Sequence, residues 1–335
     1  MDYNAPMTDA AQPLPHFSDV AAAAQRIACV AVRTPLVESP LLSELSGGRV
    51  FLKLEILQRT GSFKFRGAYN RLVQLDASER KRGVVAFSSG NHAQGVAAAA
   101  ALLNMPATIV MPSDAPRVKM ENTKALGATI VPFDRVRESR EEIAARIAAE
   151  KGAVLVPAFD DFHIVAGQGT AGLEIAADAK AQGAALDAVL VPCSGGGLTA
   201  GIALALSEMS PRTRVIAVKP QGFDGTGLSL GAGTRVTAKA KELSIADSLM
   251  APSPGIVPFA ILSQCKAGAV AVSDDALMRA VAYGVRNLKL VIEPGGSAAL
   301  AALLAVAFDA KGKTIALVLS GGNIDPETLQ RCLDV

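Results

Sequence analysis

A lysine between two phenylalanines is the first feature of this sequence that could carry chemistry. Lys64 stands between Phe63 and Phe65 in the segment GSFKFRG, which runs from Gly61 to Gly67. Apolar neighbours desolvate an ammonium group and lower its pKa, and a neutral lysine amine is what Schiff-base formation requires. The same pattern also fits a lysine at a helix start whose stem packs on apolar surface while its ammonium reaches water. Lys64 alone leaves both interpretations open.

Three apolar runs end in small, polar, glycine-rich turns. They are FSSGNH at residues 87–92, PCSGGG at residues 192–197 and LSGGN at residues 319–323. In open α/β sheets, ligands bind beyond the carboxyl ends of the strands, where helix N-termini and free backbone amides meet anions. A single turn of this kind is explained by chain reversal, but three of them in one chain indicate a ligand site.

The turn SGGGL is the candidate phosphate site. Its residues are Ser194, Gly195, Gly196, Gly197 and Leu198. Consecutive glycines let backbone amides approach an anion, and the helix expected to follow adds its positive end. No Gly-Lys-Ser/Thr follows, and the dinucleotide fingerprint with its ribose-binding acid is missing. A phosphate on a ligand of mononucleotide size fits this turn better.

Composition and charge exclude other classes of protein. The chain has 335 residues, of which 50% are hydrophobic, and its 33 basic and 31 acidic residues give a net charge of +2. It has no basic stripe with interleaved aromatics, so we expect no nucleic-acid partner. Its 4 cysteines form no CxxC pair, and its 3 histidines are too few for a Cys/His zinc site. Without a signal core or an uninterrupted apolar run of membrane length, we expect a cytoplasmic protein that contacts no membrane.

Short apolar runs alternate with helical patterns along the chain, which is typical of a parallel sheet covered on both faces. We expect strands at residues 50–54, 83–87, 107–111, 128–131, 153–156, 188–192, 215–218 and 314–319. We expect helices at residues 19–30, 93–103, 117–126, 139–151, 169–180, 198–209, 274–288 and 297–307. Residues 222–258 are rich in Gly, Ser and Pro and are expected to form a mobile or interface-lining loop.

Four segments together carry a resemblance to a known family. They are SFKFRGA from Ser62, SSGNHAQG from Ser88, GQGT from Gly167 and SGGN from Ser320. In this order, over residues 34–325, they resemble the threonine/serine dehydratase and serine racemase family, which are pyridoxal-phosphate (PLP) enzymes of the tryptophan synthase β fold type. The combination favours the Schiff-base interpretation of Lys64.

The resemblance implies an α/β fold of PLP fold type II, in which two open, mostly parallel sheets are flanked by helices and the cofactor lies in the interdomain cleft. Residues 1–59 and 156–335 would form a discontinuous large PLP-binding domain, and residues 60–155 a small, mobile substrate-binding domain. The family also implies a homodimer. Because the chain stops soon after the last expected strand, we expect no regulatory domain.

The resemblance also assigns cofactor-binding residues. Lys64 would form the Schiff base with PLP, Phe63 would pack against the pyridine ring, and Asn91 would bind the ring's 3′-oxygen. Ser320 would donate to the pyridine nitrogen, which makes the ring a weaker electron sink than an aspartate would and favours prompt loss of a β-substituent. Glu293 would lie near the ring edge, although its EPGG segment equally fits a helix N-terminal turn. The phosphate would be held by Ser194, Gly195, Gly196, Gly197 and Leu198.

Substrate-binding roles fall on the turn after residue 87. Ser88, Ser89, Asn91 and His92 would bind the substrate carboxylate through hydroxyls and backbone amides. Ser89 is also a catalytic candidate, since racemases place a hydroxyl there, on the cofactor face opposite the lysine. Arg140 would reach a second substrate carboxylate, or else it is a solvated helix residue.

These roles imply α,β-elimination of water from L-threonine or L-serine, giving a 2-oxo acid and ammonia. The alternatives with the same cofactor site are a serine or aspartate racemase and a β-hydroxyaspartate dehydratase. A catalytically silent PLP-binding protein is an alternative of a different class, and the joint presence of Lys64, Asn91, the glycine turn and Ser320 disfavours it. A β-replacement synthase usually has a different substrate loop.

One residue departs from the family pattern in a way that bears on metal binding. Lys219 stands before Pro220 where many relatives have an acid that helps bind a divalent cation. An ammonium would repel Mg²⁺ or Ca²⁺ and would itself occupy the ion's place. We therefore expect no divalent-metal requirement, although Asp224 and Asp247 keep a weak site open.

Overall fold

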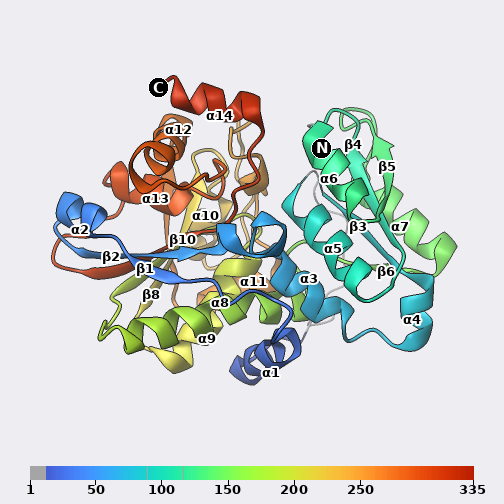
Figure 1. The fold of residues 1–335 in the computed structure, drawn as a ribbon, viewed down its shortest axis with the longest axis horizontal. Helices are drawn as coiled ribbons and strands as arrows, with labels where there is room; N and C mark the ends of the chain where they lie inside the picture. The colour runs from blue at the N-terminus through green and yellow to red at the C-terminus, as the bar shows by residue number, and fades with distance from the viewer. Residues whose placement is uncertain (1–12, 89, 116) are drawn as a thin grey trace.

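The computed structural model describes residues 13–88, 90–115 and 117–335, which form two lobes, each built around its own sheet (Figure 1). The strands of the larger sheet are β1 (Leu36–Glu38), β2 (Arg49–Leu54), β7 (Ala188–Pro192), β8 (Arg214–Pro220), β9 (Gly268–Val272) and β10 (Thr314–Leu319). Those of the smaller sheet are β3 (Val84–Phe87), β4 (Ala107–Pro112), β5 (Thr129–Phe133) and β6 (Val154–Leu155).

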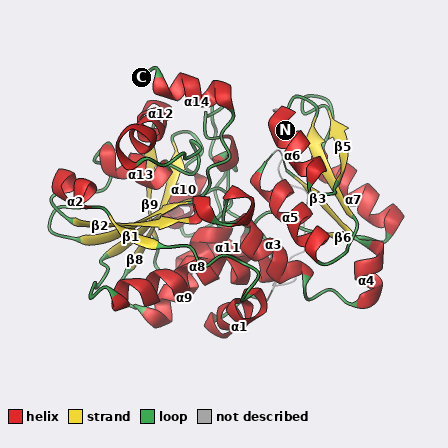
Figure 2. Ribbon diagram, in the orientation of Figure 1, coloured by secondary structure: helices red, strands yellow, loops and turns green. Residues whose placement is uncertain are grey.

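Both sheets have the strand orders of crossover folds. The larger runs β1-β2-β10-β7-β8-β9 and the smaller β5-β4-β3-β6. Every pairing is parallel except that of β1 with β2. Parallel neighbours need helical crossovers, and these place helices on the sheet faces (Figure 2). The expected α/β architecture of two open, mostly parallel sheets is confirmed.

Fourteen helices connect and cover the strands of the described ranges. They are α1 (Phe17–Ile27), α2 (Pro40–Ser46), α3 (Lys64–Leu72), α4 (Ala77–Arg82), α5 (Asn91–Leu102), α6 (Arg117–Ala125), α7 (Arg140–Lys151), α8 (Phe162–Ala181), α9 (Gly197–Met209), α10 (Gly225–Ala232), α11 (Ile256–Gln264), α12 (Asp274–Tyr283), α13 (Ala298–Leu304) and α14 (Pro326–Leu333). A π-helical turn, Gly284–Leu288, continues α12.

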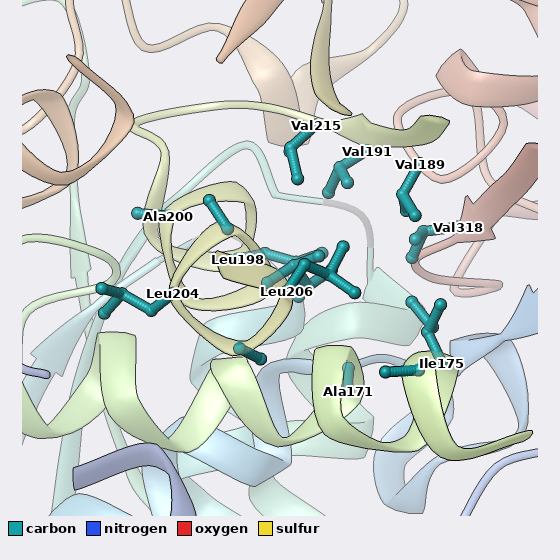
Figure 3. Packing of buried hydrophobic residues seen from close by; sticks show 14 of the residues in the cluster. Ala171, Ile175, Val189, Val191, Leu198, Ala200, Leu204, Leu206, Val215 and Val318 are labelled. Atoms are coloured by element: carbon teal, nitrogen blue, oxygen red, sulfur yellow. The ribbon is translucent and has the colours of Figure 1, made fainter. Parts of the chain in front are cut away.

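The core of the larger lobe shows why its central strands are apolar throughout. Val189 and Val191 of β7 face the cluster that contains α8 and α9, whereas Leu190 faces the cluster around α13 (Figure 3). Successive side chains of a strand point to opposite faces, so a strand covered on both sides reads as one continuous apolar run. The carboxyl ends of β7 and β10 carry two of the glycine-rich turns, and β3 of the smaller sheet carries the third.

Several elements differ from the sequence expectation. The segment 222–258 was expected to be a loop, but it contains α10, the 3₁₀ turn Asp247–Leu249 and the beginning of α11. Helix α8 begins well before residue 169 because Asp161 caps it, accepting a hydrogen bond from the amide of Ile164 at 2.8 Å.

The smaller sheet uses only strands between Val84 and Leu155, and the larger sheet uses strands on either side of that stretch. We propose domain boundaries near residues 60 and 155 on this basis. None of the helices in the described part of the chain has the length and apolarity needed to cross a bilayer.

Candidate active site

Lys64 is held at the carboxyl end of the larger sheet. The extended residue before Phe63 forms a β-bridge with Gly321, and the Phe63 amide donates to the Ser320 carbonyl at 3.1 Å. Helix α3 then begins at Lys64 itself. These bonds fix the lysine next to the turn that follows β10, where the sequence placed the pyridine-nitrogen partner Ser320.

The Lys64 amine is positioned and weakly basic. Its Nζ donates to the carbonyl of Ala158 at 2.7 Å and lies 5.2 Å from the centroid of the Phe63 ring. Burial lowers the pKa of Lys64 to about 8, and only the charge of Glu293 opposes this shift. An amine with such a pKa is partly neutral near neutral pH, so it can attack an aldehyde and accept a proton.

A chain of amide and carboxyl groups joins the loops around Lys64. The Asn91 Nδ2 donates to Glu293, while its Oδ1 accepts from the Asn323 Nδ2 at 2.8 Å. Asn323 also donates to the Thr60 carbonyl at 2.7 Å. A Cβ added to Gly321 would lie 2.5 Å from the Glu293 carboxyl, so this position requires glycine. Four segments, around residues 60, 91, 293 and 323, are thereby joined by hydrogen bonds, and Asn323 joins the candidate set.

Glu293 is a buried carboxyl that resists ionisation. Burial raises the pKa of Glu293 to about 7, the charge of Asp247 adds to the shift, and Lys119 opposes it. A cavity of about 170 Å³ lies beside it and is lined by Lys119, Asp247 and Asn323 among others. Near neutral pH the group is therefore poised between its neutral and charged forms at a candidate ring edge.

Replacing Glu293 with glutamine is expected to stabilise the cofactor-free protein in alkaline solution. A carboxyl whose folded pKa lies above its unfolded value loses stability as pH rises between the two, here from about 4.5 to about 7. The gain in the free energy of unfolding should be on the order of 3 kcal/mol at pH 8 and should vanish below about pH 4.5. Urea unfolding at both pH values measures it, with the exposed Glu121→Gln as control. A gain that is independent of pH would contradict the raised pKa.

The glycine turn after β7 lets other groups approach its backbone closely. Gly196 has a φ of +99°, which favours glycine, and α9 begins at the next residue. A Cβ on Gly195 would lie 2.3 Å from the Phe159 ring, and one on Gly197 would lie 3.1 Å from Phe159. Within the described ranges, the backbone amides of these three glycines donate to no protein acceptor. Free amides at the N-terminus of a 13-residue helix suit a phosphate.

The tripeptide Ala158–Asp160, which the sequence did not single out, joins several parts of the site. Ala158 accepts from Lys64, Phe159 packs against the glycine turn, and the Asp160 carboxylate accepts from the amides of Ile256 and Val257, at 2.9 Å each. The segment therefore holds the lysine, the glycine turn and the start of α11 in register. Only the acid before a helical pattern signalled it in the sequence, and that signal pointed to a local cap.

Two cationic side chains, those of Arg140 and Lys119, lie near residues of the proposed substrate turn or next to it, and each is paired with a carboxylate, Arg140 with Glu141 at 2.8 Å. The Arg140 guanidinium carbon lies 5.4 Å from the centroid of the Phe87 ring, directly before Ser88. The Lys119 Nζ lies 3.7 Å from where a Cβ would stand on Gly90, and it pairs with Asp247 at 2.9 Å. Ser89, the candidate acid on the opposite cofactor face, lies outside the described residues.

His92 lies inside the small lobe. It is buried, its Nε2 is 2.9 Å from the Val156 carbonyl, and burial lowers its pKa to about 3, with the Lys64 charge adding to the shift. The ring is therefore neutral and packed at physiological pH. A substrate contact of His92 remains a proposal, and it would use the backbone amide.

The residues present fit PLP. Two buried hydroxyls, those of Ser62 and Thr199, have no partner among the described residues, and they flank Lys64 and the glycine turn in the sequence. Together with the free glycine amides they offer donors to an anion beside a lysine amine of lowered pKa. Such a donor set is what a phosphate-bearing aldehyde needs.

Comparison with known proteins agrees with this chemistry. The family model described as "Pyridoxal-phosphate dependent enzyme" matches residues 30–321. The chain belongs to this family of PLP-dependent enzymes. In this PLP-dependent enzyme, the matched region contains all the cofactor-binding candidates, from Phe63 to Ser320. The resemblance seen in the sequence is confirmed.

Relatives of this PLP-dependent enzyme are named for several activities, and three of them illustrate the range. An L-threonine ammonia-lyase of Thermotoga maritima is 41% identical over 95% of this chain and 78% of its own length. An L-threo-3-hydroxyaspartate ammonia-lyase of a Pseudomonas species is 42% identical over 94% of this chain and 97% of its own. The structure of maize serine racemase superposes with a TM-score of 0.89, at 35% identity, covering 96% of this chain and 98% of the other.

The last prediction from the sequence concerns metal binding. Lys219 is buried, and its Nζ donates to the carbonyls of Ser194 at 2.8 Å and Ala251 at 3.0 Å. No group of three or more His, Cys, Asp or Glu side chains suited to a metal occurs among the described residues. The expected independence from divalent metal stays a prediction.

Proposed function

We propose that this protein is an ammonia-lyase that removes water from L-threonine or L-serine and yields a 2-oxo acid and ammonia. The observation that carries the proposal is the Lys64 amine, which has a pKa lowered to about 8 and lies beside the turn that contains Ser320. When bound, PLP supplies an electron sink for the electrons released at the substrate α-carbon.

The chain's own groups have distinct proposed tasks. The Lys64 amine accepts the α-proton, since its pKa lets it be neutral near physiological pH. The amides that follow Ser88 bind the substrate carboxylate, and the glycine turn holds the cofactor phosphate. Ser320 would donate a hydrogen bond to the ring nitrogen without transferring its proton. Loss of the β-hydroxyl is thus favoured over long-lived charge at the α-carbon.

A product assay tests this function. The PLP-loaded protein is incubated with L-Thr, L-Ser, D-Ser and both diastereomers of hydroxyaspartate, with and without EDTA, and 2-oxo acid, ammonia and enantiomer composition are measured. We expect equal amounts of 2-oxo acid and ammonia from L-Thr or L-Ser. Accumulation of the D-amino acid without 2-oxo acid would show a racemase instead.

A second candidate substrate is β-hydroxyaspartate, and the cationic surroundings of the substrate turn favour it. Arg140 lies against the Phe87 ring and is paired with Glu141, and Lys119 lies near Gly90 and is paired with Asp247, so a second substrate carboxylate would replace one of these partners. A second carboxylate on the substrate would find a partner there once the lobes close. An L-threo-3-hydroxyaspartate ammonia-lyase is also among the relatives.

Replacing Arg140 with glutamine separates the two substrates. If Arg140 binds a second carboxylate, kcat/KM for hydroxyaspartate should fall by about 10- to 100-fold while kcat/KM for L-threonine changes little. Arg137, whose side chain is 85% exposed, provides the matched control as Arg137→Gln. An equal loss with both substrates, or no loss with either, would remove Arg140 from the substrate site.

Three further proposals come from the sequence and the family resemblance. We propose a homodimer, a cytoplasmic location and a small domain that moves to close the cleft. Sedimentation of the PLP-loaded protein measures the first. Ser89 stays a candidate acid for a racemase side reaction, which the enantiomer assay detects.

A further inference from the structure

A buried ammonium group stands directly behind the glycine turn. Lys219 is the penultimate residue of β8 and is 1% exposed. Its Nζ donates to the carbonyl oxygens of Ser194 at 2.8 Å and Ala251 at 3.0 Å, two segments that no ladder joins. Burial lowers the pKa of Lys219, and Cys193 and Asp224 oppose that shift. Carbonyl oxygens converging on one positive centre form the kind of coordination that a bound cation receives.

This contact determines which way the turn's amides point. A peptide unit is planar and trans, so the Gly195 N–H points away from the Ser194 carbonyl that Lys219 holds. The next carbonyl, that of Gly195, accepts from the Gly255 amide at 2.9 Å, so the Gly196 N–H also points away from that side. The two donors that hold these carbonyls are Lys219 of β8 and the Gly255 amide. They lie on the side of the turn opposite the free amides. The cation thereby orients the Gly195 N–H, and the Gly255 amide orients the Gly196 N–H, so that both donors point toward an anion on the same side.

We propose that the Lys219 ammonium is a tethered cation that takes the place of a bound metal ion and orients the Ser194–Gly195 peptide, so that the glycine turn binds phosphate without a divalent cation. The inference rests on the proposed cofactor site, in which this turn holds the PLP phosphate. Lys219 is a positioning residue, since it acts through the peptide and touches no reacting atom. Beside it lies a cavity of about 80 Å³, lined by Lys219, Asp224, Gly227, Ala269, Val270 and Ala271.

The test compares Lys219→Met with Lys219→Glu in the cofactor-free full chain. Methionine keeps the stem and removes the charge. Glutamate adds a carboxylate near Asp224 and the two carbonyls, which is an oxygen set suited to Mg²⁺. The readouts are the dissociation constants of inorganic phosphate and of PLP and the Tm, each in EDTA and in excess Mg²⁺.

For the wild-type chain we expect equal phosphate affinity and equal Tm in EDTA and in Mg²⁺. Lys219→Met should bind phosphate about 10- to 100-fold more weakly in both conditions, because a charge-assisted hydrogen bond is lost. Lys219→Glu should be weak in EDTA and recover in Mg²⁺. Wild-type affinity that falls in EDTA and returns with Mg²⁺, or unchanged phosphate binding by Lys219→Met, would overturn the proposal.

Two controls keep the outcome decisive. Lys53→Met removes another fully buried ammonium of the same sheet, bonded to Thr34 and Glu174, so it should lower the Tm while leaving the phosphate affinity unchanged. If Lys219→Met does not fold, the test rests on Lys219→Glu. If Mg²⁺ restores neither the folding nor the phosphate binding of Lys219→Glu, the proposed role of Lys219 is contradicted. Phosphate affinity is measured without turnover. If the wild-type protein binds phosphate but forms no 2-oxo acid, the proposed function is refuted and the proposed role of Lys219 is not.

Discussion

Replacing Lys64 with alanine is expected to lower turnover by at least about 10³-fold, because one side chain provides both the attachment of the cofactor and the base for the α-proton. The amine lies 2.7 Å from the Ala158 carbonyl and 5.2 Å from the centroid of the Phe63 ring. The absorbance of lysine-bound cofactor near the visible edge should disappear as well. Steady-state assays and absorbance spectra of the purified variant measure both effects.

The control for this experiment is an exposed lysine that is distant from the site. Lys311→Ala should retain wild-type turnover and absorbance, since its side chain only flanks a surface turn. The Lys64→Ala variant should still bind PLP through the glycine turn, but reversibly, so dialysis should remove the cofactor. Retained near-visible absorbance after dialysis would exclude Lys64 as the attachment point.

Replacing Arg66 with methionine is expected to lower the free energy of unfolding by about 3–5 kcal/mol, because a buried ion pair loses one partner. Arg66 and Glu55 are both 0% exposed as side chains and are 2.8 Å apart, and Arg66 also contacts Glu174 at 2.7 Å. These bonds anchor the first turn of α3, where Lys64 lies, to the 3₁₀ turn directly after β2 and to α8. Urea unfolding at pH 7 measures the loss.

Two variants test the cause of this loss. The pair of Arg49 with Glu38 is about 37–38% exposed on each side, so Arg49→Met should cost less than about 1 kcal/mol. The double variant Arg66→Met/Glu55→Gln should be less destabilised than Arg66→Met alone, since no unpaired carboxylate is left buried. A double variant as unstable as the sum of both single changes would indicate lost packing instead.

The elements that could be predicted from the sequence were those whose own residues show a clear hydrophobic pattern. The run at residues 314–319 is apolar after Thr314 and forms β10, because a strand buried on both faces has this pattern. Strand β9 was missed because its sequence GAVAV consists of small residues with no clear period. Helix α11 was missed because Pro258 interrupts a uniformly apolar segment, and its cap, Asp160, comes from 96 residues away.

The residues of the candidate site also divide into those with a local signal in the sequence and those without one. Lys64 and the glycine turn were found because their residue types carry the chemistry themselves. Ala158 acts through its backbone carbonyl, and Phe159 acts by the place of its ring, so neither has a signature in residue type. The Lys119–Asp247 pair joins residues 128 positions apart, and only the tertiary fold brings them together. The family resemblance assigned roles to side chains but gave no account of these supporting contacts.

Locating the bound cofactor tests the central claim most directly. Borohydride reduction of the PLP-loaded protein fixes any Schiff base to its lysine, and trypsin no longer cleaves after a modified lysine. We expect the cofactor mass on one peptide, TGSFKFR, which spans Thr60 to Arg66 and retains the uncleaved Lys64. Cofactor on a different lysine, or an unmodified protein that still turns over L-threonine, would contradict the assignment of Lys64.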